Sequence, residues 1–71
     1  MAEFRVIRAL RAQAKADKEK ALMALELLTE KAVGIGDHTA EDFLKDAELS
    51  LQTLVDADDK LETLNRYFKD E

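Results

Sequence analysis

The amino-acid sequence predicts an all-α protein: an antiparallel two-helix hairpin that dimerises into a four-helix bundle. Three observations predict this class. The 71 residues include no proline, which would break a helix interior. The two glycines stand together near the middle of the chain. On both sides of them, apolar residues recur every three or four positions among good helix formers. We expect one domain (1–71), with a helix at about 2–32, a turn at 33–39 and a helix at about 40–69.

The first helix is predicted to bury a stripe that is rich in alanine. Its apolar positions follow steps of three, four and seven through Phe4, Ile7, Leu10, Ala14, Ala21, Leu25, Leu28 and Ala32. Alanines permit close approach of a second helix but bury little area per residue. Between Ala21 and Leu28 the helix is apolar almost all round. Because one partner helix cannot cover that width, it indicates a second neighbour.

The predicted turn contains the residue types that end one helix and begin another. Gly34 suits the left-handed conformation that commonly follows a last helical turn, and Gly36 follows closely. Thr39 is a good N-cap for the second helix, because its hydroxyl can accept a hydrogen bond from a free backbone N–H. A connection this short makes the two helices antiparallel neighbours.

The second helix carries a heptad pattern with two polar interruptions. Its seam is predicted to run in alternating steps of four and three through Ala47, Leu51, Leu54, Asp58, Leu61, Asn65 and Phe68. A polar residue at such a position can specify register or oligomeric state, and we assign that role to Asp58 and Asn65. Asp58 is also placed to meet Arg8 or Arg11 across the hairpin.

Two helices alone make a line of contact rather than a core. Small scaffolds need disulfides, a metal or oligomerisation, and this chain has no cysteine. We therefore expect a homodimer whose core and interface contain Leu22, Leu25, Leu28, Leu44, Leu51, Leu54, Leu61 and Phe68. Two interpretations stay open for Met23, Leu27 and Leu49, which either lie within the homodimer or form a docking patch for another protein.

Composition excludes several classes of function. With no cysteine and a single histidine, the chain lacks the usual ligands of a metal centre, and we expect no metal, cofactor or small-molecule substrate. His38 beside Asp37 is the candidate for proton transfer, but no nucleophile or second carboxylate stands at a defining spacing, so a polar loop residue is the simpler interpretation. No apolar run reaches the ~20 residues of a membrane span, and we expect no signal peptide. These features predict a cytoplasmic protein that is not an enzyme.

Charge is divided unevenly along the chain, whose formal net charge is −5. Residues 1–20 carry six basic and three acidic side chains, and the remainder carries five basic and thirteen acidic ones. In an antiparallel hairpin the basic half lies beside acidic residues of the second helix, which would fix the register. The alternative is a nucleic-acid-binding strip formed by Arg5, Arg8, Arg11 and Lys15, and the net negative charge argues against it.

Two segments carry a family resemblance. Residues 33–39 read VGIGDHT, and residues 56–68 read DADDKLETLNRYF. This turn and terminal helix resemble small helical-hairpin accessory proteins of T4-like marine cyanophages, over about the last two thirds of the chain. The resemblance implies a small phage accessory protein in the cytoplasm of an infected bacterium, and it transfers no catalytic or binding residue.

These observations predict a non-enzymatic accessory protein that acts through protein–protein interaction. Its expected partners are a second copy of the chain and a host protein. The architecture is also similar to the Rop proteins, which are RNA-binding dimers of helical hairpins. That analogy implies an alternative function, in which the basic half of the first helix binds RNA and Phe4 supplies an aromatic.

Overall fold

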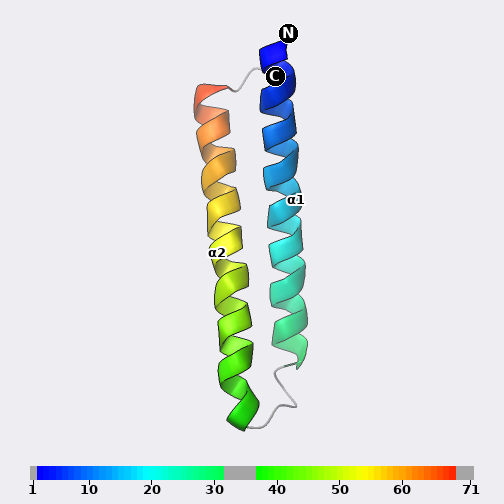
Figure 1. Cartoon of the computed structure of the whole chain (residues 1–71), viewed down its shortest axis with the longest axis vertical. Helices are drawn as coiled ribbons and strands as arrows, with labels where there is room; N and C mark the ends of the chain where they lie inside the picture. Colours follow the sequence, from blue (N-terminus) through cyan, green and yellow to red (C-terminus); the bar gives the residue numbers. More distant parts are fainter. Residues whose placement is uncertain (1, 32–36, 69–71) are drawn as a thin grey trace.

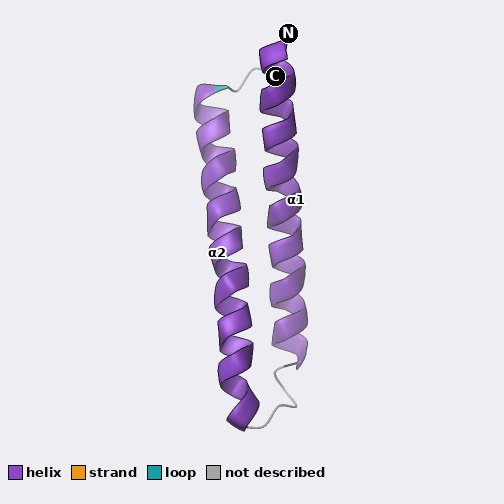
Figure 2. Cartoon of the chain, in the orientation of Figure 1, coloured by secondary structure: helices purple, strands orange, loops and turns teal. Residues whose placement is uncertain are grey.

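The computed structural model is a hairpin of two long helices packed side by side (Figure 1). Helix α1 spans Ala2–Lys31 and helix α2 spans Asp37–Tyr67. The structure describes residues 2–31 and 37–68, with side chains for 5–31 and 40–68. The molecule is a rod of 53 × 14 × 13 Å, and α1 begins at the end where α2 finishes. Outside the two helices, the bend at residue 68 is the only other described structure (Figure 2).

The helix boundaries agree with the sequence-based prediction except at the start of α2. Helix α1 ends one residue before its predicted limit, and α2 ends two residues before. Helix α2 starts at Asp37, so the prediction of a start at Ala40 is wrong by one turn. Acidic residues in the first turn suit the positive end of the helix dipole, and Asp37 extends that turn toward the loop. Thr39 is therefore the third residue of α2 rather than its N-cap. The predicted turn residues Gly34 and Gly36 lie outside the described residues.

The face of α1 that packs on α2 follows a strict heptad. Covered residues recur in steps of four and three through Ile7, Arg11, Ala14, Lys18, Ala21, Leu25 and Leu28, and Asp17 and Ala24 beside this line are also half-buried. The alanine-rich stripe is thus confirmed, with Ala14 and Ala21 almost fully covered. Leu10 is the exception, because nearly half of its side chain is exposed. Arg11 and Lys18 stand at the seam positions between the apolar ones, where their aliphatic stems can pack.

The face of α2 that packs on α1 keeps one row of the predicted heptad, through Ala47, Leu54 and Leu61, and its other row is displaced by one residue. The covered positions are Ala40, Phe43, Ala47, Ser50, Leu54, Ala57, Leu61 and Leu64. The prediction placed Leu51, Asp58 and Asn65 in this seam and is wrong, because all three side chains are exposed. Ser50 and Ala57 take the seam positions instead. Ala57 lies near the height of Ala21, where two small side chains let the backbones approach closely.

Little apolar volume is enclosed by this seam. Among the described residues, the buried side chains are Ala14, Ala21, Ala57 and Leu64. Three of these four carry a single methyl group. The hairpin is therefore held by a narrow line of contact, as expected for two helices without a third layer.

Candidate interaction surface

Large apolar side chains are spread over the outside of the hairpin. Eleven described residues of this kind are exposed: Val6, Leu10, Leu22, Met23, Leu27, Leu44, Leu49, Leu51, Val55, Tyr67 and Phe68. Single exposed leucines are ordinary on protein surfaces, but larger exposed apolar patches mark interaction sites. The described residues thus include eleven exposed large apolar side chains and only four buried apolar ones. We therefore take the surface, rather than an internal pocket, as the candidate functional site.

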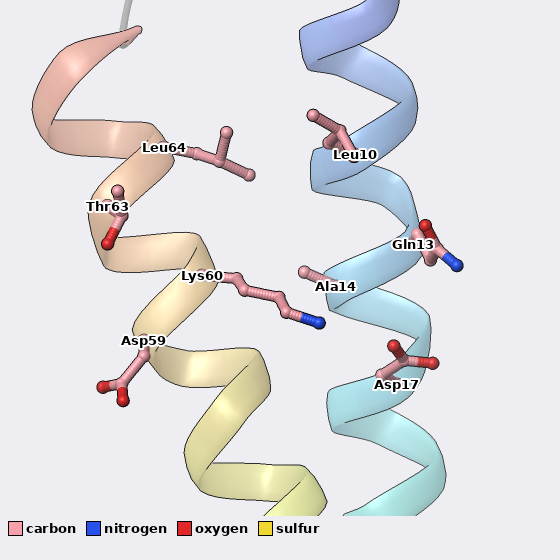
Figure 3. Close-up of a pocket in the computed structure, with 8 residues that line it drawn as sticks. All are labelled: Leu10, Gln13, Ala14, Asp17, Asp59, Lys60, Thr63 and Leu64. Carbon is pink, nitrogen blue, oxygen red and sulfur yellow. The ribbon is translucent and has the colours of Figure 1, made fainter.

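The exposed apolar residues fall on two sides of the seam. On one side lies a groove between the helices with a volume of about 400 Å³, lined by Leu10, Gln13, Ala14, Asp17, Asp59, Lys60, Thr63 and Leu64. Figure 3 shows Lys60 extending from α2 toward α1 beside Ala14, with Leu10 and Leu64 pointing toward each other above it. Two acidic side chains and an amine interrupt the apolar lining of this groove.

The opposite side carries four exposed apolar side chains, which we call the leucine flank. Its members are Leu22 on α1 and Leu44, Leu51 and Val55 on α2. Leu44, Leu51 and Asp58 are seven residues apart, so they form one row beside the seam on α2. Lys15 and Leu22 form the corresponding row on α1. Leu51 and Val55 also border a hollow of about 670 Å³ on the outer face of α2.

Two contacts across the seam fix how the helices are aligned. Lys18 Nζ lies 3.3 Å from Asp58 Oδ1, with both side chains partly exposed. Arg11 Nη2 donates hydrogen bonds to the backbone oxygens of Phe68, at 2.9 Å, and Leu64, at 3.4 Å. Leu64 O also accepts a hydrogen bond from Phe68 N–H, at 2.7 Å, so Arg11 shares this acceptor with the backbone and caps the chain where α2 ends. Asp58 was expected to meet Arg8 or Arg11, and the ion pair instead uses Lys18.

The residues predicted for the core and interface divide into two groups in the hairpin. Leu25, Leu28, Leu54 and Leu61 are half-buried in the seam. The other four, Leu22, Leu44, Leu51 and Phe68, are exposed in the single chain. The sequence analysis missed Ser50 and Ala57 on α2, and the signal that could have found them was the match of small residues to the alanines of α1.

Only part of the predicted nucleic-acid-binding strip is exposed to solvent. Arg5, Arg8 and Lys15 are exposed, whereas Arg11 is half-buried and engaged with the end of α2. Lys18, one turn beyond Lys15, is paired with an acid. Three exposed cations are a small footprint for a ligand whose binding depends on neutralising several phosphates.

Neither a metal centre nor a membrane span is present in the part of the chain that the structure describes. No group of three or more His, Cys, Asp or Glu side chains there is arranged to hold a metal ion. Neither α1 nor α2 is long and apolar enough to cross a bilayer. The side chains of Asp37 and His38, the candidate proton-transfer pair, lie outside the described ones.

Comparison with known proteins adds no family to these observations. The chain matches no protein-family model, no curated protein and no solved structure. Inference about function therefore rests on the hairpin's own surface.

Proposed function

We propose that this chain is a non-enzymatic accessory protein that acts through protein–protein contacts, as a dimer of helical hairpins forming a four-helix bundle. The observation that carries the proposal is the solvent-accessible area of the single hairpin, 5786 Å². Size scaling gives about 4,450 Å² for a compact monomer of 8.0 kDa. The hairpin thus exposes roughly 1,300 Å² more than a compact chain of its mass would.

That excess has the size of a protein–protein interface. A standard interface removes about 800 Å² from each partner. Self-association of this extent would cover much of the excess, and the bundle that results is the usual way for hairpins to complete a core. The phage resemblance supports an accessory role in an infected bacterial cell, with a host protein as a further partner.

Light scattering after size exclusion, repeated over a concentration series, tests the proposal. We expect a mass of twice the 8.0 kDa chain that persists on dilution. Helical circular dichroism, measured on the same samples, should fall only when the dimer dissociates. A single species with the monomer mass at every concentration would overturn self-association.

A further inference from the structure

The leucine flank lies at one height on the two helices. Lys18 and Asp58 are paired, and Leu22 and Val55 each stand one helical turn from that pair, toward the loop. Leu51 follows Val55 one turn further. Leu22 follows the seam residue Ala21, and Leu51 follows the seam residue Ser50. In an antiparallel hairpin, residues that follow equivalent seam positions on the two helices lie on the same side of the seam. Leu22, Val55 and Leu51 therefore form one apolar centre on the side away from the Lys60 groove.

This side suits a second copy better than the groove side does. Exposed fractions of 37%, 52% and 44% for Leu22, Leu51 and Val55 leave apolar area for a partner to cover. Across the seam, the groove is lined in part by Asp17, Asp59 and Lys60. An interface over the groove would desolvate these charges. On the leucine flank, Leu22, Leu51 and Val55 are themselves apolar, and Lys45 and Glu48 border the hollow beside Leu51 and Val55.

The charges around the leucine flank differ between its two ends. Toward the chain ends, the rows beside it carry three basic and three acidic side chains: Arg5, Arg8, Lys15, Glu19, Asp58 and Glu62. Toward the loop, the described side chains of the same rows include three acids and no base: Glu26, Glu41 and Glu48. Two copies packed in the same direction would bring the acidic ends together. Two copies packed in opposite directions would place the acidic end of each over the end of the other that carries the basic residues.

We propose that the leucine flank is the contact between two copies of this chain, packed face to face with their loops at opposite ends. The two-fold axis then passes near Leu22, which lies against Leu22 of the partner subunit. Lys15 of each copy falls beside Glu26 of the partner subunit. This inference rests on the proposed dimer and adds its face and its direction.

Matched substitutions on α2 test the face. Leu51→Glu puts a charge into the proposed contact, and Leu49→Glu puts the same charge two residues away, at the edge of the outer hollow that is turned away from Leu22. Leu49 is the more exposed of the two, at 68% against 52%. We expect Leu51→Glu to weaken dimerisation at least tenfold, by light scattering over a dilution series, and Leu49→Glu to leave it within twofold. Circular dichroism at high concentration establishes that both variants keep the hairpin.

The outcomes separate the face from the dimer itself. If the parent chain is a dimer and Leu49→Glu alone dissociates it, the leucine flank is the wrong face while the proposed function stands. If both variants remain dimers, the contact lies elsewhere and the inference is likewise overturned. If the parent chain is a monomer, both the proposed dimer and the proposed contact face are overturned.

A cysteine placed on the proposed axis tests the direction. Because the chain contains no cysteine, Leu22→Cys introduces one thiol per copy. With loops at opposite ends, mild oxidation should convert most of the protein to a covalent dimer, since a disulfide forms when the two Cα atoms approach within about 7 Å. Packing in the same direction would instead bring Leu22 to Leu51 of the partner subunit. Covalent dimer from a mixture of Leu22→Cys and Leu51→Cys, but from neither alone, would overturn the proposed direction.

Discussion

The position of Ala57 in the seam can be tested by a single substitution, Ala57→Asp. Ala57 is 2% exposed, whereas its neighbour Asp58 is exposed and paired with Lys18. A carboxylate at position 57 is taken out of water, and Lys18 on the facing helix is already paired with Asp58. The desolvation costs about 2–4 kcal/mol, and replacing alanine by aspartate in a helix adds about 0.6 kcal/mol. The total is a large share of the roughly 4–10 kcal/mol expected for a chain of this length.

Thermal unfolding followed by far-UV circular dichroism measures this loss. Since about 1 kcal/mol shifts the melting temperature of a small domain by roughly 4–8 °C, Ala57→Asp should lower it by at least about 10 °C. Ala16→Asp is the matched control, because Ala16 is exposed on α1 and bears only the helix-propensity cost. Both are compared at one protein concentration, since association shifts apparent stability. Equal melting of the two variants would refute the seam described for α2.

Three further substitutions address other contacts of the hairpin. Arg11→Met removes the donor that caps α2, and we expect a loss of about 1–2 kcal/mol in urea unfolding, with faster amide exchange confined to the last turn of α2; uniform exchange would argue against the cap. Lys18→Gln breaks the ion pair to Asp58 and should cost less than about 1 kcal/mol, a difference that shrinks in high salt; a larger, salt-independent loss would contradict a surface pair. Leu54→Asp, in the half-buried seam, should cost several kcal/mol and abolish the melting transition; parent-like melting would exclude Leu54 from the seam.

The fold was predictable because it depends on local signals. The lack of proline, the placement of both glycines and the three-and-four spacing of apolar residues define two helices and one turn, and the structure has that hairpin. The start of α2 was predicted too late because Thr39 has a strong N-cap preference, while Asp37 and His38 are also compatible with a first helical turn. Boundary residues are decided by competition between such near-equal choices.

The seam of α2 was harder to predict because its two candidate rows exchange rank along the helix. In mid-helix Leu51 is more apolar than Ser50, which favours the predicted row. Toward the C-terminus Ala57 and Leu64 are more apolar than their neighbours Asp58 and Asn65, and the covered row is that of Ser50, Ala57 and Leu64. Which of the two rows faces α1 depends on the side chains of α1, and these are distant in the sequence from the rows of α2. The roles of Arg11 and Lys18 were unpredictable for the same reason.

The displacement of the seam also explains why leucines remain on the outside. The seam alternates alanines with larger side chains such as Leu25 and Leu54, and this single line of contact has no room for the leucines of the neighbouring rows. Those side chains flank the seam, where a second layer can cover them and no rearrangement of the hairpin is needed. The alanines thus determine how the two helices of one chain pair, and the leucines are free to determine what the pair binds. On this argument, stability and association are coupled through one surface, and conditions that dilute the partner should also loosen the hairpin.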